Sequence, residues 1–326
     1  MVPLKKAGIK LDAFNARIIN LTSANKNIIM NKHLVCCLLI VSASFSACPQ
    51  STTLTSVSEK SIETAPKLSD ADFPQPTPSA RHNEKVNAIK ESDYDLVLIG
   101  DSITHTLHNF GGKYDPMTKR VWDKYYAPHR AINLGYSGYR TEQILWHLQN
   151  GELDFKTSPK AFMILIGTNN LDERHFKIVH TPEQVFAGTK AIVDLIRQRH
   201  STSKILLMRI FPRGGDNEIS VSPPHFNSSA KTIASARRAG ELTQQLADDK
   251  HVFWLDVGHI FLRTDGSINT DNMWDLLHPS PAGAEAWARE VEPILAKWIG
   301  DKSVSVSHTL SSETPASTLS DNLQHR

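Results

Sequence analysis

The segment Asp95-Leu96-Val97-Leu98-Ile99-Gly100-Asp101-Ser102-Ile103 joins a short, almost entirely apolar run to a glycine and a hydroxyl residue. An apolar run of this kind predicts a strand that helices cover on both faces, because it has no polar side to turn toward water. The glycine permits a tight turn, and the serine stands where a helix would begin. We therefore expect Ser102 at the carboxyl end of a buried parallel strand.

Four further apolar runs, each bounded by charged residues, glycine or proline, predict more strands: Ala131 to Leu134, Ala161 to Ile166, Lys204 to Ile210 and His251 to Val257. Amphipathic stretches between and after them predict helices: Thr141 to Gln149, Pro182 to Arg199, Ser229 to Asp249 and Pro281 to Ile299. Thr181 and Ser280 supply helix caps, each followed by a proline in the first turn. The alternation predicts a three-layer α/β/α sandwich around a five-stranded parallel sheet.

The composition is that of an ordinary globular protein. The chain has 326 residues, of which 40% are hydrophobic and 21% charged, with a formal net charge of +2. This charge gives no field that would attract nucleic acid, so we expect no nucleic-acid partner. All three cysteines, Cys36, Cys37 and Cys48, lie before residue 50. The rest of the chain can therefore form neither an internal disulfide nor a thiolate metal site.

The N-terminal region has the layout of an export signal. An apolar run from Leu34 to Val41 follows Lys32 and precedes several small residues, and it is too short to span a bilayer as a helix. If translation begins at Met30, the segment ending in Ala47-Cys48 resembles a bacterial lipoprotein signal. We therefore expect a signal peptide over residues 1–48 and an extracytoplasmic protein anchored in a membrane through lipid on Cys48. Plain secretion, to the periplasm or beyond, and an uncleaved apolar stretch are the alternatives.

Two segments lack any sustained apolar period. Residues 49–92 are rich in Ser, Thr, Pro and charged residues, which predicts a disordered tether. Residues 300–326 contain many Ser and Thr and no aromatic residue, so we expect a disordered tail. The domain itself is expected to span residues 93–299.

Three other segments place polar residues where chemistry is expected. Ligands of parallel sheets bind beyond the carboxyl ends of the strands. Gly135 to Thr141 follows the second strand, and Gly167-Thr168-Asn169-Asn170 follows the third. An Asn amide there can donate to a developing oxyanion. Asp275-Leu276-Leu277-His278 precedes the last helix and places a carboxylate one turn before a base, the pair that a nucleophilic serine needs.

Each of these signals alone also fits a helix cap or a turn, but all of them fall in order at strand ends. Together they resemble the SGNH/GDSL hydrolases, whose motifs are built around Ser, Gly, Asn and His. The nearer resemblance is to the catalytic subunits of platelet-activating-factor acetylhydrolase Ib and their bacterial relatives. It runs from about Asp95 to Trp298, and the blocks that carry it are Asn133-Leu134-Gly135, Leu145-Trp146, Asn150-Gly151-Glu152-Leu153, Gly167-Thr168-Asn169-Asn170, Phe211-Pro212-Arg213-Gly214 and Asp275-Leu276-Leu277-His278.

This resemblance implies a flavodoxin-like SGNH hydrolase fold and a role for each motif. Ser102 is then the nucleophile, His278 the general base and Asp275 the residue that orients it. The main-chain N–H groups of Ser102 and Gly138, with the side chain of Asn169, form the oxyanion hole. No cofactor and no metal are expected, since His105 and His108 lack an accompanying Glu-x-x-His pattern.

The function expected is a serine esterase that removes a short acyl group, such as acetyl, from a small carbohydrate or lipid ester. A lysophospholipase or thioesterase with a longer acyl pocket is a second hypothesis. A surface lipoprotein that binds without catalysis is a third. The presence of Ser102, Asn169, Asp275 and His278 together argues against this third hypothesis, because a binding protein has no need of all four.

Overall fold

The predicted strands form one parallel sheet in the computed structural model, which describes residues 79–108 and 115–301. The strand order is β2-β1-β3-β4-β5, and all four neighbouring pairs are parallel. The strands are β1 (Leu96–Gly100), β2 (Ala131–Gly135), β3 (Ala161–Leu165), β4 (Lys204–Met208) and β5 (Val252–Leu255). The five predicted strands are confirmed, although the predicted runs continue past the ends of β4 and β5.

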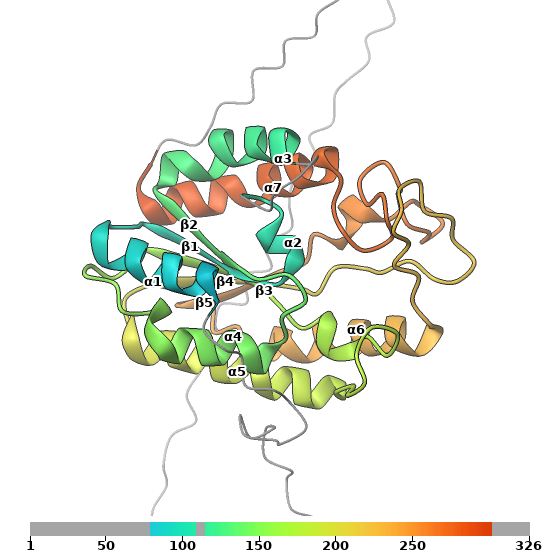
Figure 1. Cartoon of the computed structure of the whole chain (residues 1–326), viewed down its shortest axis with the longest axis horizontal. Coiled ribbons are helices and arrows are strands. Elements are labelled where there is room, and N and C mark those ends of the chain that lie inside the picture. The colour runs from blue at the N-terminus through green and yellow to red at the C-terminus, as the bar shows by residue number, and fades with distance from the viewer. Residues whose placement is uncertain (1–78, 109–114, 302–326) are drawn as a thin grey trace, which may run out of the picture. The chain divides into compact units, whose positions relative to one another are not determined.

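Helices cover both faces of this sheet, with α3 and α7 on one side and α4 and α5 on the other (Figure 1). The α-helices are α1 (Ala80–Glu91), α2 (Ser102–His105), α3 (Asp115–Val121), α4 (Thr141–His147), α5 (Pro182–Arg199), α6 (Ala230–Thr243) and α7 (Pro281–Ile299). Shorter helical segments are η1 (Trp122–Tyr126), η2 (Ala127–His129), η3 (Leu148–Glu152), η4 (Asn169–Leu171), η5 (Gln244–Leu246) and η6 (Gly258–Phe261). The three-layer α/β/α sandwich is therefore confirmed.

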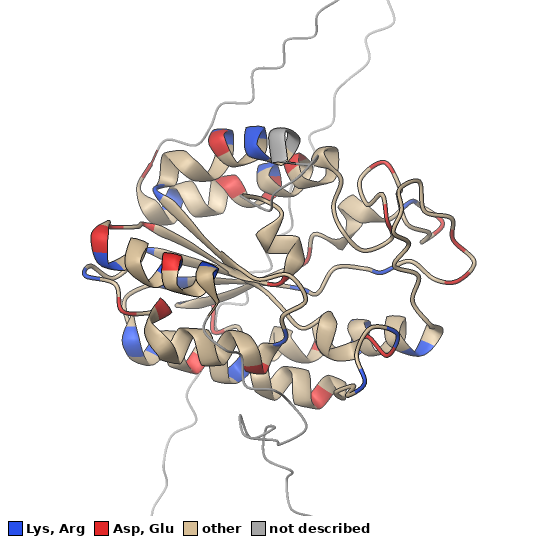
Figure 2. Cartoon of the chain, in the orientation of Figure 1, with Lys and Arg blue, Asp and Glu red and all other residues tan. Residues whose placement is uncertain are grey.

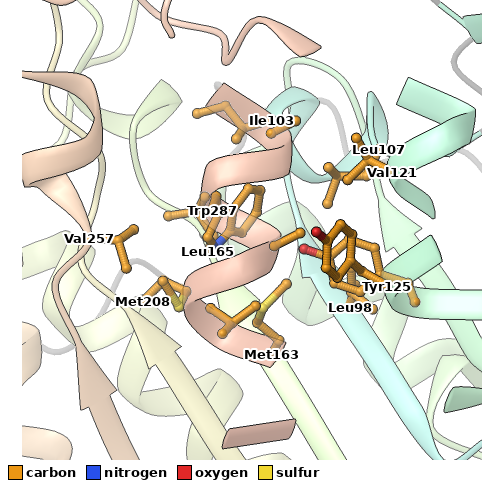
Figure 3. Close-up of a cluster of buried hydrophobic side chains, with 14 of the residues drawn as sticks. Leu98, Ile103, Leu107, Val121, Tyr125, Met163, Leu165, Met208, Val257 and Trp287 are labelled. Carbon is orange, nitrogen blue, oxygen red and sulfur yellow. The ribbon is translucent and has the colours of Figure 1, made fainter. Parts of the chain in front are cut away.

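Alternate side chains of the strands pack into two separate cores, because successive residues of a strand point to opposite faces. Leu98 and Met163 belong to the core on the α7 face, where Trp287 is fully buried (Figure 3). Val97 and Phe162 belong to the opposite core with side chains of α4 and α5. The near-continuous apolar character of the strands follows from this burial on both faces.

The N-terminal starts of α5 and α7 follow from their N-cap residues. The Thr181 side chain accepts a hydrogen bond from the main-chain N–H of Gln184 at 3.2 Å, and Ser280 accepts one from Gly283 at 3.1 Å. In both helices a proline occupies the first turn, where no intrahelical partner for its nitrogen is needed. Both predicted helix ranges are confirmed.

Helix α1 corrects the predicted tether. The sequence predicts disorder through residue 92, but the chain is helical over Ala80–Glu91, so that prediction is wrong for this segment. The helix has few apolar positions and docks largely through polar contacts. Arg81 donates to the main-chain oxygens of Gly135 and Asn133, and Ile89 enters the core. A hydrophobic period could not show a helix that is held in this way.

The predicted signal peptide, Cys48, residues 49–78 of the predicted tether, and residues 302–326 of the predicted tail lie outside the described residues. In the part of the chain that the structure describes, no helix is both long enough and apolar enough to cross a bilayer. Positions of Lys and Arg are interspersed with positions of Asp and Glu along the helices in the view of Figure 2. This mixture agrees with the small net charge.

Candidate active site

Ser102 lies at the junction of β1 and α2, as the sequence predicts. Asp101 is the N-cap of α2, and its side chain accepts a hydrogen bond from the main-chain N–H of Ile103 at 3.0 Å. A side chain at Gly100 would come within 2.4 Å of the main-chain oxygen of Leu165. Glycine is therefore required at this position, and the turn that presents Ser102 depends on it.

Ser102, His278 and Asp275 form a continuous hydrogen-bonded chain. The Oγ atom of Ser102 lies 2.8 Å from Nε2 of His278, and Nδ1 of His278 lies 2.8 Å from Oδ2 of Asp275. A proton on Nδ1 that is donated to Asp275 leaves the lone pair of Nε2 to accept the serine hydroxyl proton. The structure thus brings together the three residues that the sequence proposes as a triad.

The loop that carries Asp275 and His278 is held by a hydrogen bond from the loop after β4. Leu276 has a φ of 72°, in the left-handed region that non-glycine residues rarely adopt. Its main-chain oxygen accepts a hydrogen bond from the N–H of Gly214, in the loop after β4, at 2.9 Å. Phe226 packs edge-on against the His278 ring, with the ring centroids 5.0 Å apart. These contacts fix the orientation of the base.

Asn169 and Gly138, two of the predicted oxyanion-hole residues, lie on loops that contact each other. Asn169 begins η4, after β3, and its amide donates to the main-chain oxygen of Tyr139 at 2.9 Å. Gly138 precedes Tyr139 with a φ of 77°, and among the described residues other than its two chain neighbours, no atom lies within 4 Å of where its Cβ would be. The Asn169 amide has a second hydrogen. Within residues 79–108 and 115–301, no hydrogen bond joins Asn169 or Gly138 to Ser102, His278 or Asp275.

A buried ion pair that the sequence analysis missed supports the Asn169 loop. Arg213 donates to the Asp172 carboxylate at 2.6 Å and to the Thr168 hydroxyl at 3.0 Å. Burial alone would raise the pKa of Asp172, but the charge and hydrogen bond of Arg213 hold that pKa below its usual value. Arg213 stands in one of the blocks that carry the resemblance, but its partners lie more than 40 residues away, so no local spacing reveals them.

A second network joins the loop after β2 to the loop after β3. Asn170 accepts a hydrogen bond from the main-chain N–H of Thr141 at 3.1 Å and donates to the Glu142 carboxylate at 3.0 Å. Glu142 pairs with the fully buried guanidinium of Arg140 at 3.0 Å. These contacts therefore hold residues 140–142, which directly follow the segment that contains Gly138.

Asp101 adds an unusual titrating group next to the serine. Burial raises its pKa to about 6, against the hydrogen bond from Ile103 and the positive charges of His278 and Arg213. The carboxyl is 1% exposed. At neutral pH it is therefore a buried negative charge directly before Ser102.

The model of the GDSL-like lipase/acylhydrolase family matches residues 98–286, which include Ser102, Asn169 and His278. The chain belongs to this family. Among curated proteins, it is 30% identical over 216 residues to the human platelet-activating factor acetylhydrolase IB subunit alpha1, a match that covers 66% of this chain and 81% of the relative. It is 29% identical over 204 residues to the rat subunit alpha2, with 63% and 77% covered.

A solved structure shares the fold of this chain. A proposed acylhydrolase from Bacteroides fragilis superposes with a TM-score of 0.51 at 15% sequence identity, covering 67% of this chain and 96% of that one. The SGNH/GDSL resemblance seen in the sequence is confirmed, and the chain is a carboxylic ester hydrolase.

Proposed function

We propose that this hydrolase removes a short acyl group, such as acetyl, from a carbohydrate or lipid ester through an acyl-enzyme on Ser102. The observation that carries the proposal is the hydrogen-bonded chain from Ser102 through His278 to Asp275, with 2.8 Å at each step. Among the described residues, this arrangement places a base and its orienting carboxylate on a hydroxyl group that follows a strand.

Hydrolysis would proceed in two halves. The Oγ atom of Ser102 attacks the ester carbonyl carbon while Nε2 of His278 takes the hydroxyl proton. The same nitrogen then gives that proton to the departing alcohol, and the acyl group stays on Ser102. In the second half, His278 takes a proton from water as the water oxygen attacks the acyl carbon. His278 then returns that proton to Oγ of Ser102 as the bond between Oγ and the acyl carbon breaks and the carboxylic acid leaves.

Negative charge on the carbonyl oxygen develops only as the tetrahedral intermediate forms. The main-chain N–H groups of Ser102 and Gly138 and the second amide hydrogen of Asn169 are the donors we assign to it. The open space beside Gly138 supports this assignment, because it lets an oxygen approach the main chain. The bond from Asn169 to Tyr139 holds the amide in place before substrate arrives.

The short acyl group is supported by the names of the related proteins, which are acetylhydrolase subunits. The lipid mediator in those names is not part of the proposal. We also propose that the enzyme is exported and anchored through Cys48, on the sequence pattern alone. An extracytoplasmic site would give the enzyme access to esters of surface carbohydrates or lipids.

Hydrolysis of p-nitrophenyl esters of increasing chain length tests the proposal. Wild type should prefer acetate or butyrate to octanoate in kcat/KM. Ser102→Ala and His278→Ala should each lose activity to the background level while keeping the wild-type melting temperature within a few degrees. Ser201→Ala, in an exposed turn, is the matched control and should keep full activity. Activity of the Ser102→Ala variant near that of the control would overturn the assignment, and a preference for octanoate would favour the longer-chain hypothesis.

A further inference from the structure

A buried group of metal-ligating side chains lies apart from the triad residues in the sequence. His82 of α1, His147 of α4 and Glu152 of η3 bring their ligand atoms within 4.8 Å of one another, and we call these three residues the His–His–Glu cluster. Their side chains are 5%, 0% and 1% exposed. Three ionisable groups this deeply buried need a compensating partner.

The distances within the His–His–Glu cluster are short on every side. Nδ1 of His82 lies 2.8 Å from Oε1 of Glu152, and Nδ1 of His147 lies 3.1 Å from the same oxygen. The two Nδ1 atoms lie 2.7 Å from each other. All three atoms therefore face a common point rather than separate partners.

Protons alone do not make these three contacts attractive together. If both Nδ1 atoms carry protons and donate to Glu152, the two N–H groups oppose each other across the shortest side. If one of them is deprotonated, its lone pair faces the carboxylate oxygen instead. A single cation that accepts a lone pair from each of the three atoms would make all three contacts attractive.

We infer that the His–His–Glu cluster binds a divalent transition-metal ion of the zinc type, through Nδ1 of His82, Nδ1 of His147 and Oε1 of Glu152. Two imidazoles and one carboxylate are a donor set found at zinc and iron(II) sites. In tetrahedral geometry, ligands about 2.1 Å from such an ion are about 3.4 Å apart, so an outward shift of these side chains by a few tenths of an ångström is needed.

A tyrosine contacts one ligand of the proposed site. The hydroxyl of Tyr136 donates a hydrogen bond to Oε1 of Glu152. The phenol therefore orients this ligand, a role that neighbouring residues have at metal sites. Arg81 lies over the Tyr136 ring at 5.3 Å, and its charge moderates the affinity for a cation.

The ion would connect parts of the chain that are distant in sequence. His82 is 65 residues from His147 and 70 from Glu152. Tyr136 begins the segment that leads to Gly138, so the ion would also brace the loop assigned to the oxyanion hole. This role is structural, because the proposed chemistry at Ser102 needs no metal.

The test uses the untagged full-length chain after treatment with a chelator. Titration with Zn²⁺ should show one bound equivalent and a raised melting temperature. Co²⁺ should bind with a visible absorption band from imidazole and carboxylate ligation, whereas Mg²⁺ should not compete. Binding of less than about a tenth of an equivalent of Zn²⁺ would overturn the inference.

Three variants locate the site. Glu152→Gln and His82→Gln should bind Zn²⁺ on the order of 100-fold more weakly, and Tyr136→Phe about 10-fold more weakly through loss of its bond to Glu152. His259→Gln, at an exposed position, is the matched control and should bind like wild type. If a ligand variant does not fold, Tyr136→Phe still decides the question. Equal affinity in Tyr136→Phe, His259→Gln and wild type would place the ion elsewhere and refute this site.

Discussion

Asp275 holds His278 at two points. One carboxylate oxygen accepts a hydrogen bond from the main-chain N–H of His278 at 2.6 Å, and the other lies 2.8 Å from its Nδ1. The same residue therefore positions both the main chain and the ring of His278. An amide in place of the carboxylate can keep the first contact but not the charge of the second.

Asp275→Asn should lower kcat by about 10³-fold to 10⁴-fold, because the ring loses the partner that keeps Nε2 free to take a proton. The main-chain contact to His278 survives in the variant, so the melting temperature should change little. Steady-state kinetics and thermal unfolding on one preparation check both statements. A kcat within tenfold of wild type would show that Asp275 has no such role.

Asn169→Ala should slow acylation by about 10²-fold to 10³-fold while changing substrate affinity little, since an oxyanion donor acts on charge that exists only in the transition state. Loss of the bond to Tyr139 should also cost about 1 kcal/mol of stability. Single-turnover acylation, affinity and melting temperature measured together separate the two effects. Near-normal acylation with a large fall in melting temperature would leave Asn169 a purely structural role.

Arg213→Met should destabilise the fold by about 3 to 5 kcal/mol, because Asp172 is left as a buried charge without its partner. The substitution should also lower the acylation rate, since Arg213 contacts Thr168, the residue directly before Asn169. The double variant Arg213→Met with Asp172→Leu should lose less stability than Arg213→Met alone. Urea unfolding of wild type and the two variants measures this, and a double variant that is no more stable than Arg213→Met would contradict the coupling.

Asp101→Asn should stabilise the protein above pH 6. In the fold, the pKa of Asp101 is raised from 3.8 to about 6, so its favourable contribution is present below pH 4 and is lost as the pH rises through 6. The gain over wild type should approach about 3 kcal/mol at pH 7.5 and vanish near pH 4. Urea unfolding across this range, with the exposed Asp93→Asn as control, is the measurement. A gain that does not vary with pH would contradict the assigned titration.

Cys48 should be the first residue of the mature protein in its native host and should carry lipid. The apolar segment that resembles an export signal ends at this cysteine. Mass spectrometry of the membrane-associated protein checks the mass of the N-terminal peptide. Cys48→Ser should release the enzyme from the membrane fraction, and an unmodified N-terminus elsewhere would support plain secretion instead.

The sheet and its long helices could be predicted because their signals are local. Apolar runs mark strands that are buried on both faces, and Thr181 and Ser280 mark helix starts directly before a proline. Helix α1 carries a weaker signal, because Ser79 caps it but few of its positions are apolar, and polar contacts from Arg81 and His82 help to hold it. The helical segment η1 was also missed, although Trp122 within it is buried.

The site could be predicted to the extent that it follows strand ends. Ser102, Asn169 and His278 stand beside turn residues whose type and order point to acyl transfer. The contacts that hold these residues in place could not be predicted, because they join residues that are distant in the sequence. Arg213 and Asp172 are 41 residues apart, and nothing in the sequence near either one indicates the other.

Ser102 and His278 are 176 residues apart along the chain, and they meet across a hydrogen bond of 2.8 Å. The first strand and the segment before the last helix must both be in place before this bond can form. A chain that is still being synthesised, or still crossing a membrane, therefore has Ser102 without the contact to His278. The appearance of esterase activity would therefore report that folding is complete. A refolding chain would become active only when the segment with Ser102 and the segment with His278 have come into contact.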